Sequence, residues 1–147
     1  MPPAKRFEMQ QILNYRAELE RLRKQEFATA KHDLDKASEK LEQERQATDE
    51  LSKEFAERQQ QIESVFEMRL YADFFARKRD QLKEQQQRVE MLDRVLEDRR
   101  QDLMDATKEK KVMEQLKEKQ EREFRKEQAH KESLLLDEIA IQKKGQE

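Results

Sequence analysis

Residues 27–41 run FATAKHDLDKASEKL, and the apolar side chains in this stretch recur in alternating steps of three and four residues. The pattern resumes further along, so that one stripe comprises Phe27, Ala30, Leu34, Ala37, Leu41, Leu51, Phe55, Ile62 and Val65. Alternating steps of this size keep all of these side chains on one face of a helix. The stretch therefore predicts a helix that packs against another helix as a coiled coil.

A second stripe with the same seven-residue repeat lies in the other half of the chain, at Leu82, Val89, Leu92, Leu96, Leu103, Ala106, Met113, Phe124, Leu134 and Ile141. Polar residues interrupt the two stripes at Glu44, Thr48, Arg58, Arg99, Lys110 and Lys117. Polar residues in a coiled-coil seam lower stability and help to fix the register of the helices. We expect a rod of moderate stability.

Ahead of Phe27, the apolar residues keep this spacing but lose the phase of the stripe. They lie at Ile12, Tyr15, Leu19 and Leu22, and the step from Leu22 to Phe27 is five residues. Because a coiled coil needs steps of three and four, the sequence predicts that the seam rotates locally or that the helix changes its winding here.

The composition favours an all-α rod over a globular domain. Of the 147 residues, 45% are charged and 34% are hydrophobic, whereas globular domains typically have about 45–50% apolar residues. A rod buries only a narrow seam, so it folds with fewer apolar side chains. The net charge of −2 and the abundance of strong helix formers argue against a disordered chain.

Residues that break helices lie only near the ends of the sequence, at Pro2, Pro3 and Gly145. A single helix of about 140 residues would be about 210 Å long, and it would need a second chain to cover its seam. The alternative is a reversal near the middle of the chain. Periodicity alone leaves open an antiparallel hairpin within one chain or a rod of two parallel chains.

The best candidate for a reversal is the segment of residues 59–69. Within it, Ser64 can cap a following helix, with Glu67 three residues later in a capping-box pattern. We therefore expect an antiparallel two-helix coiled-coil hairpin that forms a single domain over residues 1–147, with a helix at about 5–61, a turn at about 62–68 and a helix at about 69–143.

The sequence shows no pattern that is typical of a catalytic site. One glycine cannot build a phosphate-binding loop, and no cysteine is present. The two histidines, His32 and His130, lie in different arms of the expected hairpin without a metal-binding pattern around them. We expect no enzymatic activity, no cofactor and no metal.

Nucleic-acid and membrane binding also find little support. Residues 108–126 carry eight basic and five acidic residues, a weak bias for a nucleic-acid footprint. No secretory signal and no apolar run of about 20 residues is visible. These features predict a soluble cytoplasmic protein that does not bind nucleic acid.

Aromatic residues gather beside the expected turn. Tyr71, Phe74 and Phe75 lie within five residues, close to Phe66 and Leu70. Their apolar arc is wider than one facing helix covers, so part of it should be exposed, as in surfaces that bind partners. Alternatively, the same residues close the tip of the hairpin, and the two interpretations are compatible.

Four segments, in this order, carry a family resemblance: Phe7…Ile12-Leu13-Asn14-Tyr15-Arg16, Tyr71…Phe75…Leu82 with Gln85-Gln86-Gln87, Ala106…Lys110-Lys111…Glu114…Leu116, and Lys126-Glu127-Gln128…Leu136-Asp137-Glu138-Ile139-Ala140. Each motif alone is weak because coiled coils mimic one another. Together they span nearly the entire chain, and the sequence resembles the FliJ family, the small coiled-coil component of the bacterial flagellar type III export apparatus.

The resemblance implies a monomeric antiparallel coiled coil like the central stalk of rotary ATPases. It implies that the open end of the hairpin enters the pore of the hexameric export ATPase FliI, and that the chain also contacts the export gate protein FlhA and export chaperones. It further implies a location at the flagellar base, peripheral to the inner membrane. The stiff rod would couple the ATPase ring to the gate.

By that analogy, two groups of residues would bind partners. The candidates for the ATPase end are Arg6, Ile12, Leu13, Tyr15, Arg16, Asp137 and Glu138. The candidates for the gate-facing patch are Tyr71, Phe74, Phe75 and Leu82.

Two other functions fit the same residues. One is a passive coiled-coil spacer, which a stable two-chain rod would favour. The other is the equivalent stalk of a virulence secretion system, which shares the architecture but serves other substrates.

Overall fold

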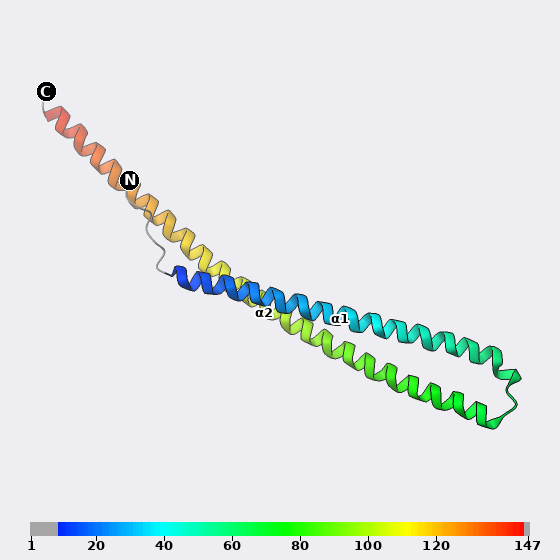
Figure 1. Cartoon of the computed structure of the whole chain (residues 1–147). Coiled ribbons are helices and arrows are strands. Elements are labelled where there is room, and N and C mark those ends of the chain that lie inside the picture. Colours follow the sequence, from blue (N-terminus) through cyan, green and yellow to red (C-terminus); the bar gives the residue numbers. More distant parts are fainter. Residues whose placement is uncertain (1–8, 146–147) are drawn as a thin grey trace. The chain divides into compact units, whose positions relative to one another are not determined.

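The computed structural model describes residues 9–145, and 97% of this part of the chain is helical, with no strand in the described range. Helix α1 spans Gln10–Arg58, a 3₁₀ turn η1 spans Gln59–Gln61, and helix α2 spans Val65–Gly145. The two long helices pack against each other as a hairpin, so the chain runs out along α1 and returns along α2 (Figure 1). The predicted all-α antiparallel hairpin is confirmed.

A short non-helical link without glycine or proline reverses the chain. After η1, Ile62 has extended backbone angles, φ −81° and ψ 112°. The backbone N–H of Glu67 donates to Ser64 Oγ at 3.4 Å, and the N–H of Met68 donates to the Ser64 carbonyl at 3.2 Å. Ser64 therefore caps α2, as expected from the sequence, and α2 begins at Val65.

The reversal lies slightly earlier in the chain than the sequence analysis placed it. The expected turn covered residues 62–68, whereas the observed link between the α-helices covers residues 59–64. Val65, which we had assigned to the first stripe, opens α2 instead and is 75% exposed. The expected helix start near residue 5 lies outside the described residues.

The chain divides into two compact units. Unit 2 comprises Arg23–Leu103 and contains the turn, while unit 1 comprises residues 1–22 together with residues 104–147. Each unit brings a part of α1 against a part of α2.

The seam of unit 2 follows the predicted stripe. On α1, Ala30, Ala37 and Leu41 are buried. The facing positions of α2 are buried or half-buried, at Leu82, Gln85, Val89, Leu92 and Leu96. Side chains at steps of three and four thus meet along a narrow line, as a coiled coil requires.

The seam of unit 1 takes a different face of α1 from the one that the sequence suggested. Leu13 and Glu20 are buried, whereas Ile12 and Tyr15 are 45% and 62% exposed. Leu22 is exposed as well. The expectation that the stripe through Ile12, Tyr15 and Leu22 faces α2 is therefore wrong.

The physical reason is that α1 keeps one unbroken pattern of three- and four-residue steps, through Leu13, Arg16, Glu20, Arg23 and Phe27. Within unit 1, ion pairs satisfy polar residues on this face, at Arg16 and Glu20. On α2, Ala106 and Met113 are buried in unit 1, and Met113 forms a small core with Leu13.

The later part of α2 leaves the seam. Leu134 and Ile141, which we had placed in the second stripe, are 54% and 71% exposed, and all residues from 131 to 145 are exposed. This part of the prediction is wrong because periodicity reports an apolar stripe whether or not another helix covers it.

Candidate protein-binding surfaces

Tyr71 and Phe75 close the tip of the hairpin around Phe55. The ring of Phe55 lies 5.0 Å from that of Tyr71 and 5.6 Å from that of Phe75, centroid to centroid, in tilted and edge-on geometries. Such pairs stabilise by about 0.5–1.5 kcal/mol beyond the area that they bury. We call these three residues the tip clasp. All three are half-buried, so two of the expected gate-facing residues hold the hairpin together.

Arg58, at the last residue of α1, adds a polar contact to the tip clasp. A hydrogen bond with Tyr71, together with the negative charges of Glu54 and Glu67, raises the pKa of the Arg58 guanidinium. A cation at this position also suits the negative end of the helix dipole. Arg58, which we had assigned to the seam, is exposed and acts at the tip.

Phe74 faces an apolar groove beside the tip clasp. The groove has a volume of about 300 Å³ and is lined by Leu51, Glu67, Leu70, Tyr71 and Phe74. The ammonium group of Lys78 lies 5.5 Å from the centre of the Phe74 ring, within the range of a cation–π contact. Two of the expected gate-facing residues, Tyr71 and Phe74, therefore line this groove.

Three exposed apolar side chains lie near the start of α2, and one of them, Leu70, lines this groove. Val65, Phe66 and Leu70 in the first turns of α2 are 75%, 72% and 53% exposed. The sequence analysis had noted Phe66 and Leu70 only as neighbours of the aromatic cluster. Leu82, by contrast, lies eleven residues beyond Tyr71, about 16 Å along the helix, and it is half-buried in the seam.

The residues expected at the ATPase end are not equally available to a partner. Ile12 and Tyr15 are exposed, whereas Leu13 is buried against Met113. Arg16 lies 5.8 Å from the centre of the Tyr15 ring. Arg6 lies outside the described residues.

Two interhelical ion pairs form the polar part of the seam in unit 1. The guanidinium of Arg16 donates to Glu109 Oε2 at 2.5 Å, and Lys110 Nζ donates to Glu20 Oε1 at 3.1 Å. The hydrogen bond to Glu20 is the main cause that raises the pKa of the Lys110 ammonium. The two pairs have opposite polarity, so each matches a cation on one helix with an anion on the other.

Asp137 and Glu138 lie far from the other candidates for the ATPase end. They are exposed on α2, and Asp137 is 24 residues beyond Met113, which contacts Leu13. At 1.5 Å per residue this is about 36 Å along the helix. Within the described residues, the ATPase-end candidates therefore form two separate groups.

Around Asp137 and Glu138, apolar residues cover more than half of the circumference of α2. The exposed ones are Leu134, Leu135, Leu136, Ile139 and Ile141. With a rotation of about 100° per residue, Leu134 and Ile141 point one way, Leu135 and Ile139 another, and Leu136 a third. We call residues 131–145 the C-terminal arm. The exposed apolar surface of this arm was not predicted, because one apolar stripe was expected for each helix.

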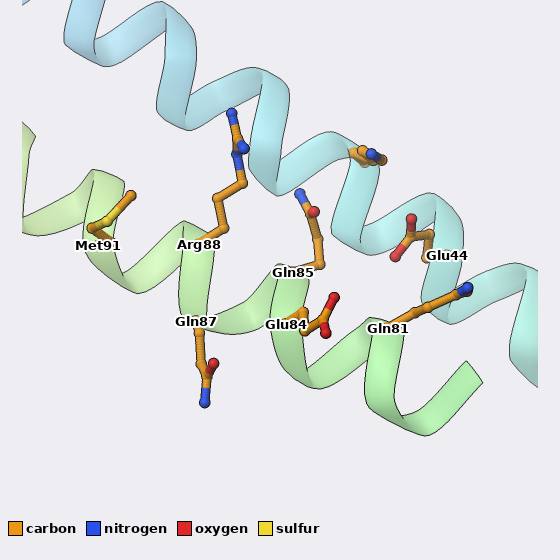
Figure 2. Close-up of a pocket in the computed structure, with 8 residues that line it drawn as sticks. Glu44, Gln81, Glu84, Gln85, Gln87, Arg88 and Met91 are labelled. Carbon is orange, nitrogen blue, oxygen red and sulfur yellow. The ribbon is translucent and has the colours of Figure 1, made fainter. Parts of the chain in front are cut away.

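A polar groove lies along the middle of unit 2 (Figure 2). It has a volume of about 700 Å³, and its lining mixes both charges at Lys40, Glu44, Gln81, Glu84, Gln85, Gln87, Arg88 and Met91. A neighbouring groove of about 440 Å³ shares Lys40, Gln85 and Arg88 with it. Mixed charges without a concave apolar pocket do not resemble a ligand site.

Within residues 9–145, no group of three or more potential metal ligands comes together. In the same range, none of the helices combines the length and the apolar character that crossing a membrane requires. The surfaces that remain are the apolar ones, at the tip, on the first turns of α1 and along the C-terminal arm.

Comparison with known proteins gives one match. The family model described as "Flagellar FliJ protein" matches residues 5–147. Searches of the curated proteins and of the solved structures found no match.

Proposed function

The chain belongs to the FliJ family and is therefore a component of the flagellar export apparatus, and from this premise we propose that it is a coiled-coil stalk that binds the export ATPase ring. The family is an export component and not a known enzyme family. In our proposal the chain supplies binding surfaces and stiffness, and the ATPase supplies the hydrolysis.

The observation that carries this proposal is the broad exposed apolar surface of the C-terminal arm, at Leu134, Leu135, Leu136, Ile139 and Ile141. A single facing helix covers about one third of a helix's circumference. Leu134, Leu135 and Leu136 point in three different directions, so a partner that buries them must contact more than one face of the arm. The pore of a ring does so, whereas a neighbouring helix or a flat surface does not.

The exposed face of α1 in unit 1 is the second element of the proposed ATPase contact. Ile12, Tyr15 and Leu22 are exposed at heptad spacing. Leu13 does not take part directly, because it holds α1 against α2. We propose that Asp137 and Glu138 help to orient the arm through polar contacts with the ring.

For the export gate FlhA and the export chaperones, we propose the tip surface. The groove beside Phe74 and the exposed side chains of Val65, Phe66 and Leu70 form an apolar surface on unit 2. Exposed clusters of this kind commonly mark protein-binding sites. In our proposal, Tyr71 and Phe75 hold this surface in place through their contacts with Phe55. Leu82 has no direct contact with the gate in this proposal.

The proposal is tested by replacing apolar side chains of the arm without touching the seam. Leu135→Ser/Ile139→Ser should weaken binding to the purified cognate ATPase at least tenfold, measured by titration calorimetry. Its matched control, Val65→Ser/Phe66→Ser, removes the same kind of side chain at the tip. It should leave ATPase binding unchanged and weaken binding to the cytoplasmic part of the gate.

All four positions are exposed, so both variants should keep the circular dichroism spectrum and melting temperature of the parent chain. Full ATPase affinity in the arm variant would overturn the stalk proposal. So would equal losses of both partners in both variants.

The state of association separates the stalk from the spacer. We propose that the chain is a monomer before it meets its partners, because its seam is closed within one polypeptide. Sedimentation equilibrium at micromolar concentration should give a mass near 17.9 kDa. A stable mass of twice this value would favour the two-chain spacer.

A further inference from the structure

Gln85 is a buried polar residue in the middle of the hydrophobic seam of unit 2. Its relative exposure is 9%, and its Nε2 donates a hydrogen bond to the backbone carbonyl of Ala37 at 3.1 Å. Ala37 is itself 6% exposed and small enough to let the long side chain reach the backbone. In Figure 2 the Gln85 side chain projects from α2 toward α1, whereas that of Gln87 points away from α1.

The contact between Gln85 and Ala37 defines the register of the hairpin. Because the helices are antiparallel, a step of seven residues along α1 matches a step of seven backwards along α2. Counting from this contact sets Ala30 beside Leu92 and Glu44 beside Lys78. Steps of three or four residues from the same contact place Leu41 beside Leu82 and Leu34 beside Val89.

The apolar residues alone would accept another register. If α2 slid by one heptad, Leu41 would face Val89, Ala37 would face Leu92 and Leu34 would face Leu96. Apolar side chains would still meet apolar side chains at these levels. The reversal would move to about residues 62–68, and this segment contains no glycine or proline that would forbid it.

Polar contacts make the stability of the two registers different. In the shifted register, Gln85 would lie at the level of Glu44 and would lose the Ala37 carbonyl. The same shift would take Lys78 away from Glu44. A buried polar group that loses its partner is costly, so the observed register is favoured.

A shift in the opposite direction is opposed at the tip. Gln85 would then face Ala30, another small residue, but the reversal would move to about residues 54–61. Phe55 would enter the turn and leave the tip clasp. The aromatic contacts thus oppose this direction. They also oppose the first one, because that slide would move Phe55 away from Tyr71 to the level of Lys78 and Leu82, and Gln85 adds a polar contact that opposes it in the middle of the seam.

We propose that Gln85 is a register-setting residue of the hairpin: its hydrogen bond to Ala37 selects one of two registers that the apolar residues around Leu34, Ala37 and Leu41 would both accept. It is a positioning residue, because it acts through the alignment of the helices. The inference does not depend on the proposed function.

The test uses cross-linking of paired cysteines by a short bismaleimide at exposed positions, since the chain contains no cysteine of its own. Ser38→Cys/Gln86→Cys reports the observed register, because both residues lie on the same side of the hairpin at the level of the Gln85 contact. Ser38→Cys/Asp93→Cys reports the shifted register, because Asp93 lies seven residues beyond Gln86. In the parent register, only the first pair should be cross-linked rapidly.

Gln85→Leu should let the Ser38/Asp93 pair be cross-linked at least tenfold faster than in the parent, while the melting temperature stays equal or rises. Gln87→Leu is the matched control, because it makes the same change at an exposed position, and it should alter neither pair. Gln85→Lys keeps a donor that reaches the Ala37 carbonyl and should restore the single register. Gln85→Leu chains in which only the Ser38/Gln86 pair is cross-linked, at the parental rate, would overturn the proposal.

Discussion

At the scale of single residues, ion pairs decide which face of α1 meets α2 in unit 1. Glu20 is 6% exposed and receives a hydrogen bond from Lys110, whereas Ile12 remains in solvent. Charge-assisted hydrogen bonds in a partly buried position stabilise more than exposed ion pairs do. Arg16 and Glu109 add a second pair at the edge of the seam.

Replacement of Lys110 should therefore cost stability. We expect Lys110→Ala to lower the free energy of unfolding by about 1–2 kcal/mol, because it removes one hydrogen-bonded partner of a buried carboxylate. Lys111→Ala changes an exposed neighbour and should stay within about 0.5 kcal/mol of the parent. Urea titration followed by circular dichroism measures both values. Equal effects at the two positions would contradict the assignment.

The same contact predicts a pH dependence. Folding raises the pKa of Lys110 above its ordinary value of 10.5, so the unfolded chain loses this proton at a lower pH than the folded chain does. The stabilisation is complete below about pH 10 and disappears as the pH rises through the raised pKa. The difference in unfolding free energy between the parent and Lys110→Ala should therefore be constant from pH 7 to 9 and should shrink at higher pH.

At the scale of elements, α1 has two stripes with coiled-coil spacing near its start, and the structure uses the less apolar one. The reason is continuity, since the face through Leu13 and Glu20 continues to Phe27 and Ala30 in steps of three and four residues. The more apolar stripe, through Ile12 and Tyr15, stays exposed.

This phase assignment can be tested with two neighbouring residues. Leu13→Ser should lower the free energy of unfolding by about 2–3 kcal/mol, because a buried leucine loses its apolar contacts and a hydroxyl enters the seam. Ile12→Ser should change it by less than about 0.5 kcal/mol. Thermal and urea unfolding of the two variants give the answer, and a reversed order would place Ile12 in the seam.

The tip clasp is the element that holds the two helices together beside the turn. Phe55→Ala should cost about 2–3 kcal/mol, somewhat less than the roughly 3–5 kcal/mol for a fully buried phenylalanine, because Phe55 is half-buried. Phe66→Ala removes an exposed ring eleven residues later and should be nearly neutral. Loss of amide protection around residues 51–75 in hydrogen exchange should accompany only the first substitution.

The sequence predicts an element well when the contacts that decide it join residues close together in the sequence. The stripe from Phe27 to Leu41 and the cap at Ser64 depend on neighbours within a few residues, and both were predicted correctly. The pair of Arg16 and Glu109 joins residues 93 positions apart. No local pattern reports such a contact, so the face of α1 in unit 1 was predicted wrongly.

For the candidate site, the sequence located the residues better than their roles. It singled out Tyr71 and Phe75, which contact Phe55, and Leu82, which lies in the seam. Their contact with the gate stays a prediction. The exposed surface of the C-terminal arm was missed because Leu134 and Ile141 fit the periodicity of a seam that no other helix covers.

At the scale of the whole molecule, the buried residues of the hairpin lie between Leu13 and Met113, and residues 131–145 are all exposed. The C-terminal arm contributes no buried side chain to either unit. Helices without tertiary contacts are only marginally stable in water, even when their sequence favours helix.

Removal of residues 131–147 should therefore leave the hairpin intact. We expect the melting temperature of the shortened chain to stay within about 1 °C of the parent, with a smaller total helical signal. Hydrogen exchange in the arm of the full chain should be fast compared with residues 27–41. A drop of several degrees would mean that the arm supports the hairpin.

An arm that exposes three consecutive leucines also bears on the life of the protein inside the cell. Proteolytic quality control engages unfolded and exposed apolar segments, so a chain that has not joined its assembly should be short-lived. We expect the cellular half-life to lengthen when the partner that covers the arm is co-produced. Supply of the stalk would then follow demand through turnover, with no need for matched synthesis.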